Sequence, residues 1–382
     1  MKLKVLILLF LCLILPKASY AYYVYRPCCC NCNRLAGWWV DADYLLAWRR
    51  DRFYPPLLTT NSIVPPTPPI LGDPNTIILF GNQKLGCSPR SGFRFDGGLR
   101  ITECFGIGAG FFNLATERIN FSASGDLTGH PVLGRPFFNS ATGMEDVELI
   151  SFPSIPPIID GFFDFSAVNR IWGADVYMRL PGYRNCDFKL DVLAGIYFNQ
   201  IDDNLTITDH HTVPLLPPVI PPGFNLFLVT KVKDQFKSSN NYYAGMLGFT
   251  ADWRCQNWAI RSTLKVGLGN MRQVTKIKGT TTILNQFTGL EEVLDEGLLA
   301  QLNDNIGRHC HNRFEVVPDF SIKLQYRAWA RLWLSVGYNV IYWPGVVLAG
   351  EQVNLRINPA TFPNKNTNFW MQAATAGVYI FY

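Results

Sequence analysis

The residues that could perform chemistry are a few histidines, aspartates and cysteines gathered at two places in the chain. Residues 209–211 read Asp-His-His, and residues 309–311 read His-Cys-His. An imidazole beside a carboxylate can act as a general base, but hydrolysis also needs a nucleophile and a group that orients the base. The spacing provides no such set, and the sequence has no glycine-rich phosphate loop, His-Glu-x-x-His motif or nucleophile elbow. We therefore expect no enzyme activity and no cofactor.

The first 21 residues predict export from the cytoplasm. Lys2 and Lys4 precede an apolar run over 5–15, and Ser19-Tyr-Ala21 supplies small residues for cleavage, so residues 1–21 are expected to be a signal peptide. Without it, 31 basic and 29 acidic residues remain, and the formal charge falls from +5 to +2. Near-neutrality argues against a nucleic-acid partner. The mature chain has no second apolar stretch long enough for a spanning helix, so passage through a membrane would require closed strands.

Apolar and polar residues alternate with period two through most of the mature chain. In residues 38–48 every even position is apolar, and Asp41 and Asp43 lie on the other face, which is typical of a strand. Ten segments share the pattern: 38–48, 93–101, 105–114, 171–180, 188–198, 242–253, 258–268, 314–326, 332–342 and 374–382. Pro318 cannot donate a ladder hydrogen bond and predicts a bulge or a rim position.

The expected fold is all-β: a closed antiparallel transmembrane β-barrel of ten strands over residues 37–382. Twelve strands are the alternative count, because residues 118–126 and 275–284 could extend strands or form an added hairpin. A soluble β-sandwich is the competing interpretation of the same periodicity.

Aromatic residues bracket three expected strands at equal spacing. The pairs are Trp38 and Trp48, Phe188 and Phe198, and Tyr243 and Trp253. Ten residues at about 3.3 Å each, tilted by about 40°, span roughly 25 Å, the height of the lipid-facing band of an outer-membrane barrel. The pairs therefore predict two interfaces with outer-membrane lipid.

The last strand also carries a predicted assembly signal. It ends on the alternating residues Val378, Ile380 and Tyr382, which resembles the ending that barrel-assembly machinery recognises. Physically, this is an edge strand ready to pair, with an apolar face ready to enter lipid.

The connections between the expected strands alternate in length. Short ones lie near 102–104, 181–186, 254–257 and 327–330, and long ones at 49–89, 115–169, 199–241, 273–312 and 344–368. Bacterial outer-membrane barrels are arranged in this way, with both termini on the periplasmic side. We therefore expect the outer membrane of a Gram-negative cell, with both chain ends in the periplasm.

The inward faces of the expected strands collect a nearly balanced set of charges. A lone charge in a narrow lumen is costly, whereas a balanced set can pair across it. We expect an ion-pair network that fills the lumen; the alternative is a water-filled channel with weak ion selectivity, although wide channels belong to barrels of about 16 strands. The network is Asp41, Asp43, Arg94, Asp96, Arg100, Asp175, Arg179, Lys189, Asp191, Arg261, Lys265, Asp319 and Lys323, with Asp252 and Glu315 on the same face.

Most cysteines of the mature chain fall on the side of the short turns. The oxidising periplasm favours disulfides, and because nine is odd, at least one thiol cannot pair within the chain. The two hypotheses are a cross-link to another envelope protein and internal pairing with one inert thiol; Cys-x-Cys spacing alone is no zinc signature. The candidates are Cys28, Cys29, Cys30 and Cys32 in a Cys-rich segment over 22–36, and Cys104, Cys186 and Cys255 at short turns.

The sequence resembles the BBP-type outer-membrane β-barrel family of planctomycete and chlamydia-like bacteria. The resemblance implies an outer-membrane barrel of unestablished activity and brings no catalytic residues. It covers nearly all of the mature chain and rests on the segments 39–46, 55–60, 131–139, 145–149, 170–174, 190–195, 305–308, 313–318 and 336–343.

The predicted function is a structural or surface-contact role in the cell envelope. A porin-like channel for small solutes is the alternative. A surface hydrolase is the third candidate, because a ten-stranded barrel with Asp and His at its outer rim resembles surface proteases of the omptin type. Long loops stiffened by proline clusters, such as 65–69 and 217–222, are expected to carry specificity, folded inward as a plug or outward as a contact surface.

Overall fold

The computed structural model describes residues 37–86, 88–102, 105–153, 158–214 and 227–382. The expected signal peptide, the Cys-rich segment over 22–36 with its four cysteines, and Cys104 lie outside these residues. In the described chain, no helix combines the length and the hydropathy needed to cross a membrane.

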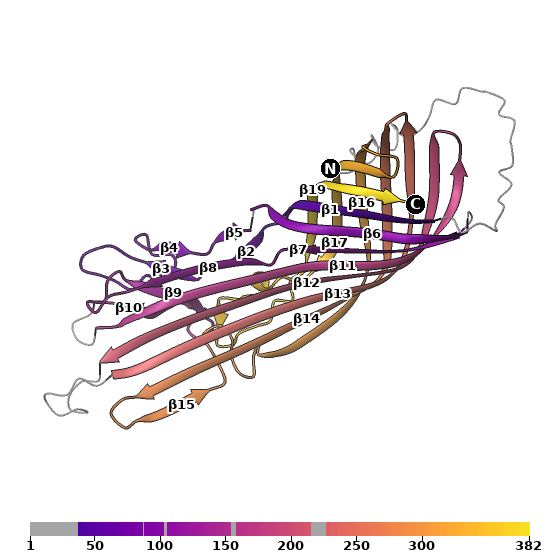
Figure 1. Ribbon diagram of the computed structural model, residues 1–382. Coiled ribbons are helices and arrows are strands. Elements are labelled where there is room, and N and C mark those ends of the chain that lie inside the picture. The colour runs from indigo at the N-terminus through magenta and orange to yellow at the C-terminus, as the bar shows by residue number, and fades with distance from the viewer. Residues whose placement is uncertain (1–36, 87, 103–104, 154–157, 215–226) are drawn as a thin grey trace.

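Ten strands form a ring in which each strand pairs with two antiparallel neighbours (Figure 1). The order around the ring is β12-β13-β14-β16-β17-β19-β1-β6-β7-β11, and pairing of β11 with β12 completes it. The predicted all-β barrel of ten antiparallel strands is thus confirmed. Its members are β1 (Gly37–Arg49), β6 (Arg90–Thr102), β7 (Phe105–Leu114), β11 (Asp160–Arg184), β12 (Phe188–Pro214), β13 (Phe227–Cys255), β14 (Trp258–Asn285), β16 (Gly307–Arg327), β17 (Leu332–Val346) and β19 (Thr367–Phe381).

The start of β1 and the end of the chain meet at one end of the ring. The Trp38 amide donates to the Tyr382 carbonyl over 3.1 Å, and the Tyr382 amide donates back over 2.9 Å. Val378 and Ile380 lie in β19, which pairs with β1 on one side and with β17 on the other. The short connections β6–β7, β11–β12, β13–β14 and β16–β17 lie at this same end, which we name the short-turn end.

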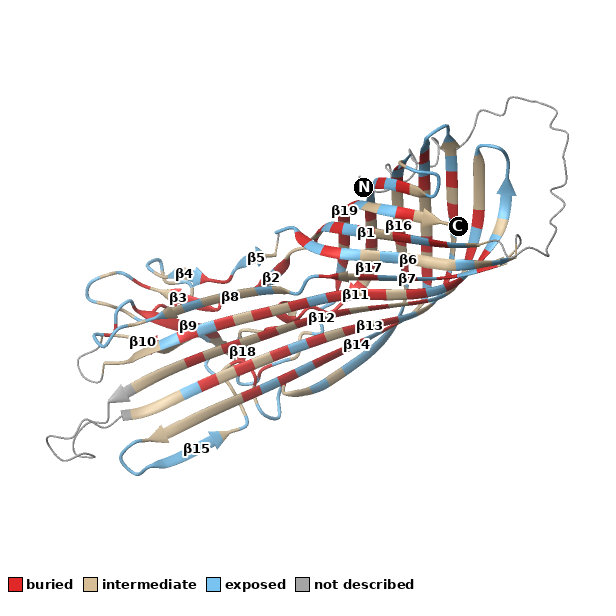
Figure 2. Cartoon of the chain, in the orientation of Figure 1, coloured by how far each residue is buried: buried red, intermediate tan, exposed pale blue. Residues whose placement is uncertain are grey.

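Burial alternates along the ring strands (Figure 2), and near the short-turn end the exposed face is apolar. In β11 the odd-numbered residues Asp175 and Arg179 point inward, whereas Val176, Met178 and Leu180 are exposed. A contiguous exposed apolar band of this extent marks a membrane-facing surface. Members of the band from other strands include Val40, Tyr44, Phe95, Leu99, Ile107, Val192, Ile196, Leu247, Phe249, Leu268, Leu324, Leu334 and Val336.

Aromatic rings follow one another across five neighbouring strands at the far edge of this band. Successive ring centroids lie 5.8, 6.1, 5.0 and 5.0 Å apart along the row Phe93, Phe111, Trp172, Phe198 and Tyr243. We call these five residues the aromatic row. It is the type of girdle that barrels place at a membrane interface.

The predicted aromatic pairs fall in register. Phe198 opposes Tyr243, and ten residues nearer the short-turn end Phe188 opposes Trp253. Trp38 and Trp48 lie on the outer face of β1, one toward each end of that strand.

Strands β11 to β14 are much longer than a membrane requires. They contain 25, 27, 29 and 28 residues, so each spans roughly 85 to 95 Å, of which about ten residues suffice to cross the lipid. Beyond the aromatic row they continue as an open sheet, the wall, made of 160–171, 199–212, 228–242 and 271–285 (Figure 1). Strands β8 (Glu117–Ser124) and β15 (Leu290–Leu294) extend it.

The predicted loops over 199–241 and 273–312 are therefore wrong in large part. The wall keeps the two-residue period, but the outer positions carry half-buried polar side chains such as Asn204, Thr206 and Thr208. This polar composition suggested a loop. The alternative that 118–126 and 275–284 extend the sheet is the arrangement observed. The sequence predicts a bulge or a rim position at Pro318. The β14–β16 register is regular there, so no bulge forms, but pairing of β16 with β17 begins only at the next residue, Asp319, so Pro318 lies at the edge of that pairing.

The long connections build a second layer, the cap, on the inner face of the wall. Phe163, Phe165, Leu205, Ile207 and Phe236 of the wall are buried against it. The cap consists of β2 (Arg52–Tyr54), β3 (Leu58–Thr60), β4 (Ile77–Phe80), β5 (Gln83–Leu85), β9 (Leu133–Asn139), β10 (Met144–Ser151), the 3₁₀ helix η1 (Ala349–Gln352) and β18 (Arg356–Ile357).

Candidate functional site

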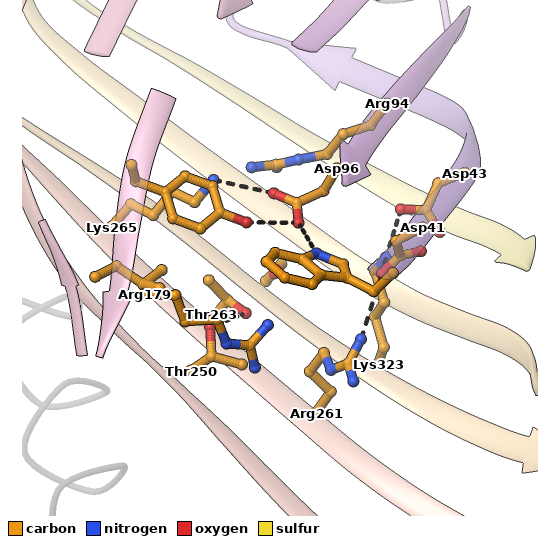
Figure 3. A pocket seen from close by; sticks show the side chains of 14 residues that line it. Asp41, Asp43, Arg94, Asp96, Arg179, Thr250, Arg261, Thr263, Lys265 and Lys323 are labelled. Carbon is orange, nitrogen blue, oxygen red and sulfur yellow. Dashed lines mark hydrogen bonds and ion pairs between the residues drawn. The ribbon is translucent and has the colours of Figure 1, made fainter. Parts of the chain in front are cut away.

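Charged side chains from opposite strands meet in the middle of the ring (Figure 3). Lys265 Nζ on β14 lies 2.7 Å from Asp175 Oδ2 on β11 and 3.5 Å from Asp96 Oδ2 on β6. Five steps separate β6 from β14 in a ring of ten, so these strands face each other across the lumen. A lysine and an aspartate can approach this closely only where the lumen is narrow.

Other members of the predicted set also pair across the ring. Arg94 Nη2 on β6 lies 2.7 Å from Asp319 Oδ2 on β16. Lys323 Nζ on β16 lies 2.8 Å from Asp41 Oδ2 and 2.5 Å from Asp43 Oδ2, both on β1. These pairs join strands that are three or four steps apart in the ring.

Nearer the short-turn end the shortest ion pairs join adjacent strands. Arg179 Nε lies 2.7 Å from Asp191 Oδ2, and Arg261 Nε lies 2.6 Å from Asp252 Oδ1. Arg184, which the sequence argument did not include, also approaches Asp191, at 3.3 Å.

Two predicted members stand apart from these pairs. Arg100 and Lys189 lie near the short-turn end and make no ion pair with another described residue. The structure thus brings eleven of the thirteen listed residues into ion pairs.

Aromatic side chains complete the filling of the lumen. Asp96 Oδ1 accepts hydrogen bonds from Trp39 Nε1 at 3.3 Å and from the Tyr177 hydroxyl at 2.7 Å. The cavity left among these side chains is about 40 Å³, enough for about three water molecules. Sequence reasoning missed these rings, although Trp39 shares the parity of Asp41 and Tyr177 that of Asp175.

A second buried ion cluster lies where the cap meets the ring. Arg52 is fully buried and donates to Glu117 over 2.7 Å and to Asp203. Glu117 also pairs with Arg49, and Asp203 Oδ2 accepts the Ala349 amide over 2.9 Å. The cluster ties four parts of the chain together: the end of β1, β2 of the cap, the wall and η1.

A third cluster joins the cap to the wall and includes one of the histidines. Arg135 on β9 donates to Asp209 on β12 and to Asp234 on β13. Glu148 Oε2 on β10 lies 3.7 Å from Arg135 Nη1, and His211 Nδ1 lies 3.6 Å from Asp209 Oδ2. Burial, and then the charge of Asp209, raises the pKa of Glu148 to about 7. Three carboxyl groups therefore share one guanidinium in a buried place.

The other histidines are not gathered into one site. His210 and His211 lie in strand β12 rather than in a loop, and His210 faces the opposite side of the sheet, stacked on Phe162 at 5.4 Å between ring centroids. His309 on β16 stacks on Phe362 at 4.1 Å. Strands β13 and β14 separate β12 from β16, so the sequence runs 209–211 and 309–311 remain apart.

The described cysteines lie at opposite ends of the molecule. Cys186 and Cys255 are exposed free thiols at the short-turn end, and Cys310 is an exposed free thiol on the cap side of β16. The Arg254 amide donates to the Asp187 carbonyl over 2.7 Å, which continues the β12–β13 register and brings the turns of Cys186 and Cys255 together.

The ring, with its exposed apolar band and filled lumen, defines a membrane β-barrel of the outer-membrane type. The sequence model of the family described as "Putative beta barrel porin-7 (BBP7)" matches residues 39–375. The chain belongs to this family and is a β-barrel protein of the bacterial outer membrane. No curated protein matches the chain.

Several solved outer-membrane structures are similar to the chain at low identity. The outer membrane protease OmpT from Escherichia coli shares 8% identity with a TM-score of 0.41, over 91% of this chain and 97% of that one. The toluene transporter TodX of P. putida shares 9% with a TM-score of 0.21, over 91% and 90%. A Pseudomonas aeruginosa FadL homologue shares 7% with a TM-score of 0.23, over 90% of each chain. At these values none of the three indicates what this protein does.

Proposed function

We propose that the protein is a non-conducting barrel without enzyme activity that carries its cap at the cell surface, where the cap makes structural or adhesive contacts. Both chain ends then lie in the periplasm with the short-turn end. The observation that carries the proposal is the approach of Lys265 to Asp96 across the full width of the ring. A lumen filled in this way leaves room for a few waters and not for a solute.

The shape of the wall and cap supports a role in surface contacts. The wall rises far beyond the aromatic row, its outer face is polar, and its inner face is occupied by the cap. Loops that a rigid scaffold supports are where binding functions concentrate. The barrel is accordingly an anchor, and the wall and cap are the part presented to the surroundings.

A conductance measurement tests this proposal against the porin-like alternative. Purified protein in a planar bilayer is expected to give no discrete current steps, whereas a porin of about 16 strands, inserted in parallel, gives them. Replacing both Lys265 and Asp175 with alanine removes their ion pair and should make the lumen leaky; Asp96 then loses its cation but keeps its hydrogen bonds from Trp39 and Tyr177. Discrete steps from the unaltered protein would establish a channel and overturn the proposal.

The hydrolase alternative has its own test. We expect no turnover of peptide or lipid ester substrates by the folded protein in detergent. Hydrolysis that disappears on replacing His210, His211 or His309 with alanine would show that the protein is an enzyme.

We also propose that the thiols at the short-turn end, Cys186 and Cys255, cross-link the barrel to another envelope protein. Both are exposed, and the periplasm favours oxidation. Non-reducing gels of envelope extracts should show a larger species that reductant dissolves. Monomer alone would contradict this, and loss of both thiol signals in that monomer would indicate pairing of Cys186 with Cys255 instead.

A further inference from the structure

Three potential ligand atoms converge at the junction of cap and wall, and none of them has a hydrogen-bond partner. They are Glu148 Oε2, Asp209 Oδ2 and His211 Nδ1, each a buried atom. All three lie within 4.8 Å of one another. Buried polar atoms are nearly always paired, so a group of three without partners in one place indicates a missing ligand.

The neighbouring arginine does not supply that ligand. Arg135 directs one nitrogen to Asp209 Oδ1 and another to Asp234 Oδ2. Asp234 is otherwise satisfied, because its Oδ1 accepts the amides of Leu299 at 3.1 Å and Ala300 at 2.8 Å. The nitrogen that binds Asp209 Oδ1 also lies 3.7 Å from Glu148 Oε2, which is beyond hydrogen-bond distance. The guanidinium therefore leaves the three convergent atoms without a donor.

The charges of the cluster point to a divalent cation. Asp209, Asp234 and Glu148 carry three negative charges when ionised, and Arg135 carries one positive charge, which leaves two negative charges uncompensated. Asp209 is 0% exposed, so water does not screen this excess. A divalent ion bound to the three free atoms would neutralise it.

We propose that Glu148, Asp209 and His211 form a binding site for a divalent transition-metal ion, with Zn²⁺ as the best-matched common ion. One imidazole nitrogen and two carboxylate oxygens suit Zn²⁺, which binds three protein ligands and leaves a fourth position for water. Ca²⁺ and Mg²⁺ prefer sets made only of oxygen ligands, so the imidazole disfavours them. Arg135 and Asp234 hold Asp209 in place and are positioning residues.

Such an ion would fasten the cap to the wall. Glu148 belongs to β10 of the cap, whereas Asp209 and His211 belong to β12, whose other half crosses the membrane. The inference does not depend on the proposed function, because the site lies outside the ring and is the same whether or not the lumen conducts.

Zn²⁺ binding to the full-length protein in detergent tests the site directly. The cysteines are first alkylated, so that thiols cannot bind the metal. Calorimetry with Zn²⁺ should give one site, with Ca²⁺ as the comparison ion. Glu148→Gln and His211→Ala should each weaken binding by about 100-fold or more, since loss of even an outer-shell partner costs roughly 10 to 100-fold.

His210→Ala is the matched control, because His210 is the next residue and lies on the opposite face of the same strand. It should bind Zn²⁺ as the unaltered protein does. Absence of Zn²⁺ binding in the unaltered protein, or binding unchanged by both ligand variants, would overturn the proposal. Equal loss in His210→Ala would do the same, because it would place the metal elsewhere.

X-ray absorption at the zinc edge provides a second readout that does not depend on affinity. A ligand shell of one nitrogen with oxygens is expected. A shell containing sulfur, or several nitrogens, would contradict the assignment.

Discussion

Strands β11 to β14 run through both the barrel and the wall, yet their inner and outer faces carry opposite kinds of side chain in the two regions. In the part of β11 within the apolar band, Asp175 faces inward and Val176 faces outward. In the wall part of the same strand, Phe163 faces inward and Asp164 faces outward. The alternation of inward and outward residues is the same along the whole strand, and only the environment of each face changes. A period-two pattern therefore identifies a strand, whereas the side on which its apolar residues lie reports the solvent around it.

The buried charges of the lumen and those of the cluster around Arg135 also differ. In the lumen acids and bases are nearly equal in number, and some acids gain neutral donors as well; Asp319, for example, accepts from Arg94 and also from Asn339 at 2.8 Å. Asp41 Oδ1 and Asp43 Oδ1 nevertheless have no hydrogen-bond partner. In the cluster at the cap, one guanidinium serves Asp209 and Asp234, and nearby atoms remain without partners. The two regions therefore differ in charge balance: the lumen has nearly as many bases as acids, whereas the cap cluster has three carboxyl groups around one guanidinium.

The largest expected effect comes from removing the single cation of that cluster. Arg135→Met would leave Asp209 and Asp234 buried without a counter-charge, at a cost of about 3 to 5 kcal/mol. The cap should detach from the wall while the ring stays closed, because regions of a protein can open separately. Limited proteolysis in detergent should then cut within the cap and leave a resistant barrel fragment.

Arg94→Met is the matched variant in the lumen. Asp319 would still accept hydrogen bonds from Asn339 and, at 3.4 Å, from the Tyr197 hydroxyl, so a smaller loss of about 1 to 3 kcal/mol is expected. Its cap should stay as resistant to protease as that of the unaltered protein. If both variants gave the same digestion pattern, the two regions would not be independent.

A smaller effect should locate the edge of the lipid on β11. Val176 and Val168 lie on the same outer face, eight residues or roughly 26 Å apart along the strand, on either side of Trp172. Val176→Arg places a charge near the centre of the apolar band and should lower the free energy of unfolding by about 2 to 4 kcal/mol. Val168→Arg lies on the polar face of the wall and should cost less than about 1 kcal/mol.

The measurement is folding stability in lipid vesicles, from urea titrations of both variants and of the unaltered protein. Equal losses for the two substitutions would mean that the aromatic row does not mark the end of the lipid, and the contrast between barrel and wall would fail.

The ring could be predicted from the sequence because lipid imposes a strict rule on one face of every crossing strand. Residues such as Val176 and Val192 must be apolar, so the period stands out and ten strands can be counted. The wall could not be separated from loops in the same way. Its outer face tolerates Asn204 or Thr206, and a run of such residues in every second position resembles an exposed connection.

The two candidate sites also differ in how much of each could be predicted from the sequence. Parity alone assigns Asp96 and Lys265 to the lumen, but their contact depends on which strands face each other, and that is a property of the closed ring. The cap cluster was found only in part, because Asp209 and His211 stood out in the sequence and Arg135, Glu148 and Asp234 did not. Arg135 and Glu148 fall within segments on which the family resemblance rests, yet no spacing links them to Asp209; only the packing of a loop-derived sheet on the wall brings them together.

The smallest perturbation is a chemical label on single thiols, and it tests which region faces the outside. Cys186, Cys255 and Cys310 are exposed and contribute little to packing, so replacing any of these three with serine should change stability by less than about 0.5 kcal/mol. Two variants each keep a single cysteine: Cys310 on the cap side, or Cys255 at the short-turn end. A membrane-impermeant maleimide added to intact cells should label Cys310, and should reach Cys255 only after the outer membrane is opened. The reverse pattern would place the cap in the periplasm, where it could make no contact with the cell's surroundings, and would exclude the surface role.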